Sequence, residues 1–299
     1  MTPPLVSVNI PTFNSAKTLP TTLKSVAEQS YPAIEVIVAD SYSNDETTKI
    51  VSEFGAKLVR TKDKLLGARI EAFSQSQGTH VLLLDSDQVL DPTTIERCVA
   101  SMDRFDMLML EEDSYSPETW IQRLFQADRR MLSKIGRSQF DPYTGSMLPR
   151  FYRRTILGHA LEKIPSQLLR GVIAHDHAII YFEASRVSMR VGLVPKAIYS
   201  TEPANLLSLW TKNFRYGRSV TCLRNSPYWS LVWNKTRFRA GRHRLSYGSS
   251  STALLFLKSF AYVAGFATSD AMKLLSSNTS RQEKTVPSYD RILHLENTR

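Results

Sequence analysis

The first 110 residues alternate short apolar runs with segments of helical periodicity, and this alternation limits the possible folds more than any other feature. Short apolar runs rich in β-branched residues are typical of buried strands. Strand–helix alternation predicts an α/β protein with a doubly wound, mainly parallel sheet, because right-handed crossovers place helices on both faces. The expected strands are 5–10, 34–39, 57–61, 80–84 and 107–110, and the expected helices are 19–27, 47–54, 65–76 and 92–102.

The order of elements beyond residue 114 is less regular. The apolar stretch 253–267 is shorter than the roughly 20 residues of a membrane-spanning helix, so we expect a buried or interfacial helix, with a frayed tail from Asn278. The other expected elements are helices at 120–135, 178–188 and 205–223 and a strand at 196–199, while 144–154 stays open. We expect one domain over 1–203, with halves 1–113 and 114–203, and a helical, basic extension over 204–299.

Positive charge is concentrated near the C-terminal end. Residues 1–199 hold 23 basic and 23 acidic residues, whereas residues 200–299 hold 15 and 5, and no acid occurs between Glu202 and Asp270. That interval mixes cations with aromatic rings, which suits the headgroup level of a membrane surface. A nucleic-acid surface and a merely solvated basic face are the alternatives. The cations are Lys212, Arg215, Arg218, Arg224, Lys235, Arg237, Arg239, Arg242, Arg244 and Lys258, and the rings are Trp210, Phe214, Tyr216, Tyr228, Trp229, Trp233 and Phe238.

Cysteine usage and the N-terminal residues bear on the compartment. Cys98 and Cys222 are too few for a disulfide framework or a four-ligand zinc site. The opening residues, MTPPLVSVNI, lack the basic start and long apolar run of a signal peptide. We therefore expect a reducing, cytoplasmic setting.

Carboxylates directly follow two of the expected strands. Asp40 ends the second strand, and Asp85 and Asp87 follow the fourth in LLLDSDQ. Doubly wound sheets bind ligands beyond the carboxyl ends of their strands. Close, desolvated carboxylates are unfavourable unless a cation compensates them. Since Mg²⁺ and Mn²⁺ bind through one or two carboxylates plus substrate phosphates, the pattern predicts a metal that bridges to a diphosphate; an aspartate pair in a solvated turn is the alternative.

Three blocks in this half of the chain resemble family-2 glycosyltransferases of the GT-A fold. The blocks are VSVNIPTFN (6–14), EVIVADSYSNDET (35–47) and GARIEAFSQSQGTHVLLLDSD (67–87), in the family's order and spacing. The resemblance implies an inverting transfer of a sugar from a nucleoside diphosphate sugar. It implies uridine, or less readily guanosine, as the nucleoside, with Mg²⁺ or Mn²⁺ holding the diphosphate.

The resemblance implies a base pocket at the end of the first strand. Pro11, Thr12 and Phe13 would line this pocket, and Asp40 would meet the base. Pro11 as a strand end and Phe13 as a core residue are the structural alternatives. Tyr42 stands where the family frequently has glycine, in a turn that often needs glycine's dihedral freedom, which puts the base contact in question.

The resemblance also implies a diphosphate site. Asp85 would face the ribose or ligate the metal, with Ser86 beside it in the nucleotide site, and Asp87 would ligate the metal directly. Arg69 would lie near the nucleotide, and a solvated position on its helix is the alternative.

A catalytic base is implied at a helix start well downstream of the metal motif, and Asp176 in His175-Asp176-His177 is the positional match. It would take the acceptor's proton, with a neighbouring histidine near the metal or orienting the carboxylate. A helix cap at Asp176 and a zinc site at both histidines are the alternatives. The alternative acids near the acceptor are Glu111, Glu112 and Asp113.

Arg215 and Arg218, three residues apart on one helical face, suit phosphate oxygens of the leaving diphosphate or of a lipid phosphate. Their block, NFRYGRS, resembles the C-terminal part of membrane-associated family members. A polyprenyl phosphate acceptor is already anionic and would depend less on Asp176. We therefore expect a membrane lipid phosphate, a lipid-linked glycan or another glycan as acceptor, reached from the cytoplasmic membrane face.

Two further interpretations compete with a transferase. A sugar-phosphate nucleotidyltransferase uses a similar sheet, but the segment PTFNSAKTL lacks the glycine-rich basic loop expected after its first strand. A catalytically dead relative that only binds is disfavoured by the intact pair of Asp85 and Asp87.

Overall fold

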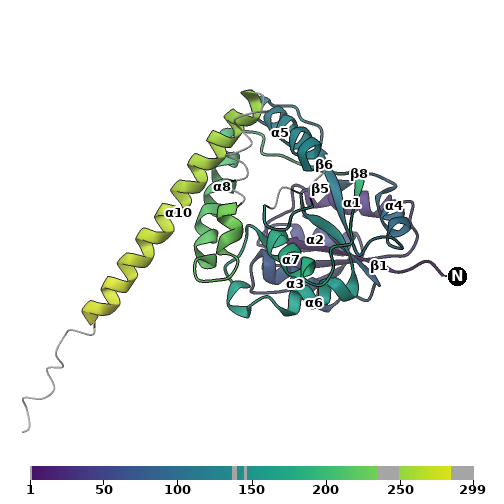
Figure 1. The fold of residues 1–299 in the computed structure, drawn as a ribbon, viewed down its shortest axis with the longest axis horizontal. Coiled ribbons are helices and arrows are strands. Elements are labelled where there is room, and N and C mark those ends of the chain that lie inside the picture. The colour runs from purple at the N-terminus through teal and green to yellow at the C-terminus, as the bar shows by residue number, and fades with distance from the viewer. Residues whose placement is uncertain (1, 137–139, 145–146, 235–236, 238–248, 284–299) are drawn as a thin grey trace, which may run out of the picture.

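The computed structural model describes residues 2–136, 140–144, 147–234, 237 and 249–283. Within them, one sheet forms the body, and two helices, α8 and α10, lie together on the side away from the N-terminus (Figure 1). The strands are β1 (Val6–Thr12), β2 (Ile34–Asp40), β3 (Lys57–Arg60), β4 (His80–Leu83), β5 (Gln88–Leu90), β6 (Met107–Ser114), β7 (Pro149–Arg153) and β8 (Val191–Ser200). The helices are α1 (Leu19–Ala27), α2 (Thr47–Glu53), α3 (Leu65–Ser74), α4 (Thr94–Ser101), α5 (Trp120–Gly136), α6 (Arg154–Glu162), α7 (Asp176–Ser185), α8 (Leu206–Val220) and α10 (Ser249–Glu283), with short 3-10 helices η1 (Ser166–Leu168) and η2 (Thr221–Leu223).

The sheet confirms the doubly wound α/β prediction. Its strand order is β3-β2-β1-β4-β7-β6-β8-β5. The first four strands pair in parallel, as does β6 with β8. The antiparallel strands are β7, between β4 and β6, and β5, at the edge beside β8. Neither was predicted as a strand: β5 has only three residues, and β7 lies in the segment left open.

Both faces of the sheet are buried, which explains the unbroken apolar runs. In β4 and the residue after it, Val81 and Leu83 face one core, and Leu82 and Leu84 face the other. The first core lies under α3, α6 and α7, and the second under α1 and α4. Successive strand side chains point to opposite faces, so a strand covered on both sides needs apolar residues at every position. The Asp85-Ser86-Asp87 motif therefore begins where this double burial ends.

The C-terminal part departs from the predictions in extent. The helix expected at 253–267 runs from Ser249 to Glu283, since polar residues before and after the apolar stretch are also helical. The fraying expected from Asn278 is therefore wrong, because the helix continues through this residue. By length and composition, Ser251–Ser269 is one helix able to cross a membrane, with 22% of that window buried. The rest of the expected tail, 284–299, lies outside the described residues, as do Lys235, Phe238, Arg239, Arg242 and Arg244.

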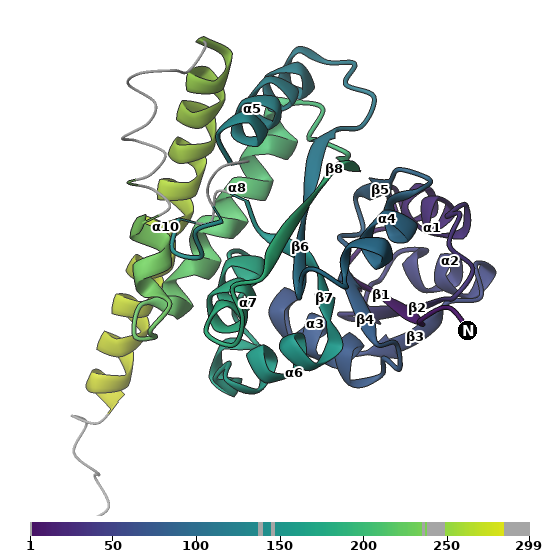
Figure 2. The same cartoon turned by 45° about the vertical axis from the view of Figure 1, so that its right-hand side comes forward.

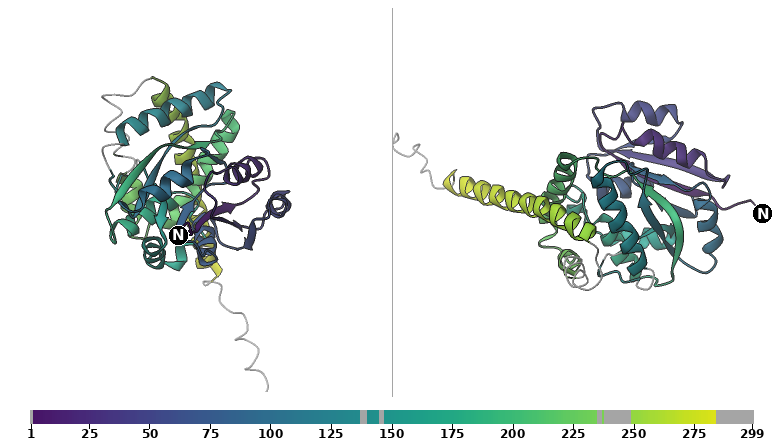
Figure 3. Two further views of the ribbon diagram at one scale, coloured as in Figure 1. Left: turned by 90° about the vertical axis from the view of Figure 1, so that its right-hand side faces the viewer. Right: turned by 90° about the horizontal axis from the view of Figure 1, so that it is seen from above.

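Helices α8 and α10 are in backbone contact, side by side in Figure 2. A Cβ at Gly217 would lie 1.9 Å from the carbonyl oxygen of Tyr262, and one at Gly265 would lie 2.0 Å from that of Phe214. Any larger residue at either position would force the helices apart. This crossing fixes α8 beside the sheet, while the C-terminal end of α10 projects beyond the body (Figure 3).

Candidate active site

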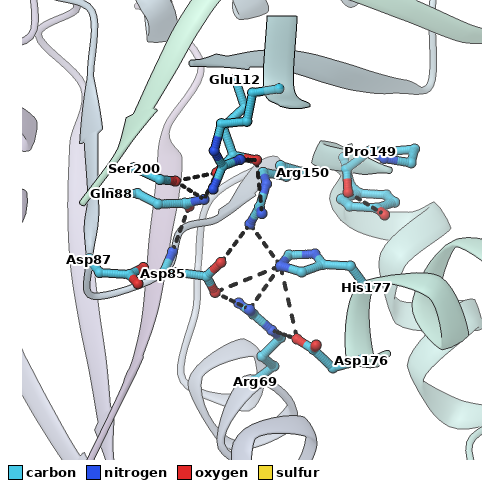
Figure 4. A network of polar contacts seen from close by, with 12 residues as sticks. Arg69, Asp85, Asp87, Gln88, Glu112, Pro149, Arg150, Asp176, His177 and Ser200 are labelled. Carbon is cyan, nitrogen blue, oxygen red and sulfur yellow. Dashed lines mark hydrogen bonds and ion pairs between the residues drawn. The ribbon is translucent and has the colours of Figure 1, made fainter. Parts of the chain in front are cut away.

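A network of charged side chains lies at the carboxyl ends of the central strands (Figure 4). Its centre is Arg69 on α3, which is fully buried. Nη2 of Arg69 donates to Asp85, and its Nε donates to Oδ2 of Asp176 at 2.5 Å. The alternative of a solvated Arg69 is therefore wrong. One arginine joins the strand-end carboxylate to the predicted base, although 107 residues separate Arg69 from Asp176.

His177 and Arg150 complete the network. Nε2 of His177 accepts hydrogen bonds from Arg69 Nη2 and Arg150 Nη1, each at 2.8 Å. Arg150 also pairs with Oδ2 of Asp85 at 3.0 Å. Burial, and then the charges of both arginines, lowers the pKa of His177. The imidazole is therefore neutral, with its proton on Nδ1.

The arginines also set the ionisation of the two aspartates. Burial alone would raise the pKa of Asp85, but Arg69 and Arg150 outweigh it and hold this pKa well below its usual range. The pKa of Asp176 is lowered in the same way, with Arg69 overcoming burial. Both groups are therefore carboxylates at neutral pH, stabilised by opposite charge.

Asp87 has a different partner. Nζ of Lys212, on α8, lies 3.2 Å from its Oδ2, and the two side chains are 35% and 32% exposed. The charge of Asp87 is the main cause of the raised pKa of Lys212. Tyr216, one helical turn further, has a pKa raised mainly by burial. The face of α8 that contains Lys212 thus meets the strand-end motif.

Arg215 and Arg218 lie elsewhere on α8. Both are exposed, and no ion pair joins either one to another described residue. Successive helical residues turn by about 100°, so Lys212 lies about 60° from Arg215 and about 120° from Arg218, beside the exposed arc that the two arginines share. Sequence reasoning found this helix but chose its solvated face. Only the spacing of the buried positions Leu209 and Asn213, which shows the side of α8 that packs on the body, could have indicated Lys212.

The predicted base pocket lies at the end of β1. Thr12 donates to Oδ1 of the buried Asp40 at 3.0 Å, and the backbone N–H of Ser43 donates to its Oδ2 at 2.8 Å. Strand β1 ends at Thr12, so Pro11 does lie at the strand end, as its structural alternative has it. Phe13 is 47% exposed, so the core alternative for this residue is wrong. Tyr42 adopts the left-handed conformation, with φ of 57°, which explains why glycine suits this position.

The structural alternatives for the His175-Asp176-His177 segment are not supported. The N-cap of α7 is His175, at φ of 67°, and no side chain caps this helix end. Nε2 of His175 lies 3.3 Å from the hydroxyl oxygen of Tyr262, away from the network. Among the described residues, no group of three or more His, Cys, Asp or Glu side chains is placed to hold a metal.

The other candidate acids have structural partners. Glu111 accepts from the backbone N–H of Lys196 at 2.9 Å, and Asp113 pairs with Arg130 at 3.0 Å. Glu112 accepts hydrogen bonds from Gln88 and Ser200. Arg129 pairs with Glu112 at 2.6 Å and also with the buried Glu202. Glu112 is thus held at the wall of the site.

Acid is expected to destabilise the fold through Glu112. Burial would raise its pKa, but Arg129 and Arg150 lower it from 4.5 to about 2. Because the folded pKa is depressed, the contribution is full above pH 4.5 and is lost as pH falls to about 2; it amounts to about 3 kcal/mol. Glu112→Gln should lower the free energy of unfolding by that amount at pH 7 and change little at pH 2, measured by urea denaturation.

The matched control is Glu118→Gln, an exposed carboxylate just before α5. Its substitution should change the free energy of unfolding by less than about 0.5 kcal/mol at either pH. A Glu112→Gln effect that is equal at pH 7 and pH 2 would mean that the side chain contributes through packing and not through its charge.

The family model described as "Glycosyl transferase family 2" matches residues 7–157, just over half of the chain. The chain belongs to glycosyltransferase family 2. Its relatives include the poly(ribitol-phosphate) beta-N-acetylglucosaminyltransferase TarS of Staphylococcus aureus (strain MW2), 28% identical over 204 residues, which cover 64% of this chain and 35% of that protein. An N-acetylglucosaminyltransferase of Rhizobium meliloti is 27% identical over 238 residues, with 73% and 56% covered. The chain thus spans from about a third to about half of these relatives.

Solved structures confirm the GT-A fold. S. aureus TarS 1–349 in complex with UDP-GlcNAc has a TM-score of 0.54 at 17% identity, covering 88% of this chain and 81% of that one. The mannosyltransferase PcManGT from Pyrobaculum calidifontis, in complex with GDP-Man and Mn2+, also has a TM-score of 0.54 at 17% identity, with 96% and 89% covered. Membership of this family speaks against the nucleotidyltransferase and nucleic-acid alternatives.

Proposed function

We propose that this chain is an inverting glycosyltransferase that moves a sugar from a nucleoside diphosphate sugar, UDP in preference to GDP, to a lipid-linked acceptor. The observation that carries the proposal is the buried arginine network. Arg69 binds both Asp85, beside the predicted diphosphate site, and Asp176, the predicted base. Donor and acceptor groups would therefore lie together where the sugar leaves the diphosphate and bonds to the acceptor, as transfer by direct displacement requires.

The donor site is proposed at the ends of β1, β2 and β4. Pro11, Thr12, Phe13 and Asp40 would hold the base, with Ser86 in the nucleotide site. Nη1 of Arg69 is buried and has no hydrogen-bond partner among the described residues, which supports a nearby anionic ligand. Asp85, with both oxygens on arginines, suits a ribose hydroxyl or an orienting role better than a metal, and its metal role stays a prediction.

The residues fit a metal that arrives with the diphosphate. Asp87 offers a partly exposed carboxylate, and Mg²⁺ or Mn²⁺ commonly takes one or two carboxylates plus substrate phosphates. Such a cation, when bound, would neutralise charge on the leaving diphosphate. Lys212 would supply a second positive charge from α8.

The acceptor half would begin after β6. Asp176 would take the proton of an acceptor hydroxyl, and His177 would keep Arg69 and Arg150 in place. We propose 1–113 as the nucleotide half, 114–203 as the acceptor half and 204–299 as the membrane-facing region, at the cytoplasmic face. A lipid-linked acceptor is supported by the Escherichia coli relative named UDP-Glc:alpha-D-GlcNAc-diphosphoundecaprenol beta-1,3-glucosyltransferase WfgD, 29% identical over 103 residues.

Calorimetry of UDP and GDP, each with and without Mn²⁺, tests the donor proposal. We expect UDP to bind in the presence of Mn²⁺ and to lose at least about tenfold in affinity without it, because the cation screens diphosphate charge at the site. GDP should bind more weakly than UDP. If neither nucleotide binds under any condition, the transferase proposal fails.

A further inference from the structure

An exposed apolar surface crosses the start of α8 and the middle of α10. Leu207, Phe256 and Phe260 are 75%, 73% and 72% exposed. A groove of about 710 Å³ runs between the two helices along this surface. The α8–α10 apolar surface consists of Leu206, Leu207, Trp210, Phe256, Phe260 and Val263. Contiguous exposed side chains of this size mark a place where a soluble body meets an apolar partner.

Helix α10 presents this surface as a regular stripe. Phe256, Phe260, Val263 and Ala267 follow one another at intervals of four, three and four, and all four are exposed. The opposite stripe is buried against α8 and α5, where Lys258 lies 3.7 Å from Asp128. A helix that keeps one side packed along the body suits contact with a membrane surface better than a crossing of the membrane, because crossing would remove that packing.

Helix α8 has two packed sides and one exposed side. Lys212 faces Asp87 in the candidate site, and Gly217 faces α10. Leu207, Arg215 and Arg218 fall within an arc of about 80° between those two sides, and all three are exposed. Arg215 and Arg218, which form no ion pair with another described residue, therefore lie on the same exposed face of α8 as Leu207.

We propose that the α8–α10 apolar surface docks on an anionic phospholipid bilayer. Its apolar side chains would enter the boundary between headgroups and acyl chains, and Arg215 and Arg218 would bind lipid phosphates. Charge decides against a second copy of the chain, because the last hundred residues hold 15 basic and 5 acidic residues and would repel each other. The docking would give the proposed transferase access to a lipid-linked acceptor. Only this purpose rests on the proposed function; the docking itself does not.

Sedimentation of the full chain with vesicles tests the docking. We compare vesicles of phosphatidylcholine mixed with phosphatidylglycerol against phosphatidylcholine alone. The wild type should bind the mixed vesicles and bind neutral ones at least about tenfold more weakly. Combining Leu207→Ser, Phe256→Ser and Phe260→Ser should weaken binding at least about tenfold. Arg215→Gln and Arg218→Gln should each weaken it about fivefold.

Matched controls use side chains exposed elsewhere. Met189 is 56% exposed before β8, and the side chain of Arg170 is 87% exposed after η1. Met189→Ser and Arg170→Gln should leave vesicle binding unchanged. All variants should keep the wild-type affinity for UDP with Mn²⁺, which shows that they fold and separates docking from donor binding.

Three results would overturn the docking proposal. The wild type could fail to bind mixed vesicles, or the triple serine variant could bind them as well as the wild type. Light scattering could instead show a dimer that the triple variant converts to a monomer, which would make this surface a contact between copies. Surface-dependent vesicle binding without any nucleotide binding would leave the docking standing and refute the transferase proposal.

Discussion

Asp176→Asn is expected to lower kcat by about 10³-fold while the affinity for UDP changes little. The amide cannot take a proton from an acceptor hydroxyl, but its oxygen can still accept the hydrogen bond from Nε of Arg69, which Asp176 now receives at 2.5 Å. The lowered pKa of Asp176 keeps the wild-type group ionised. An ordinary aspartate has a pKa of about 4, so the acid limb of the kcat profile should lie below that pH. Release of UDP from UDP-sugar, with acceptor extracted from membranes, measures the rate.

Matched variants separate proton transfer from simple loss of charge. Glu111→Gln and Asp113→Asn remove acids from the end of β6, where each has its own structural partner, and should keep kcat within about threefold. A comparable loss of kcat in either variant would move the base to that acid. If Asp176→Asn retains nearly full kcat, the acceptor nucleophile needs no base, as an anionic lipid phosphate would not.

The sheet could be predicted from the sequence because its signal is local. Strands buried on both faces are apolar at every position, and all five strands expected in the first 110 residues fall on observed strands, namely β1 to β4 and β6. Strand β7 gives no such signal: PRFYR mixes arginines with rings, since Arg150 at its start reaches the candidate site and Arg153 at its end pairs with Asp106. Its place between β4 and β6 depends on long-range pairing, which a single sequence does not reveal.

Without the family resemblance, the candidate site could be predicted only where its residues follow strands. Asp40, Asp85 and Asp87 stand at strand ends, and Asp176 and Arg69 came from the family resemblance. Arg150 and Lys212 were missed, because they reach the site from the irregular half and from one face of α8. Their charges matter, since Arg69, Arg150 and Lys212 together balance the carboxylates that crowd this edge of the sheet.

Asp87→Asn is expected to abolish metal-dependent donor binding. A neutral amide is a weak ligand for Mg²⁺ or Mn²⁺, and among the described residues no group of three metal-binding side chains exists to replace it. The affinity for UDP in the presence of Mn²⁺ should fall at least about tenfold, to the level seen without metal. Calorimetry measures this loss, and the fold is expected to survive because the side chain is partly exposed and removing one of two paired charges there costs little.

Lys212→Met provides a variant with effects of the opposite sign. Removing the ammonium 3.2 Å from Asp87 frees this carboxylate, so Mn²⁺ alone should bind about threefold to tenfold more tightly than to the wild type. UDP without metal should bind more weakly, because a cation near the diphosphate is lost. Unchanged Mn²⁺ affinity in Lys212→Met, together with full metal-dependent UDP binding in Asp87→Asn, would place the metal away from Asp87. The expected results would place the metal on Asp87 and α8 beside the donor. Asp87→Asn removes the metal ligand, and Lys212→Met removes the cation that competes with the metal for this carboxylate.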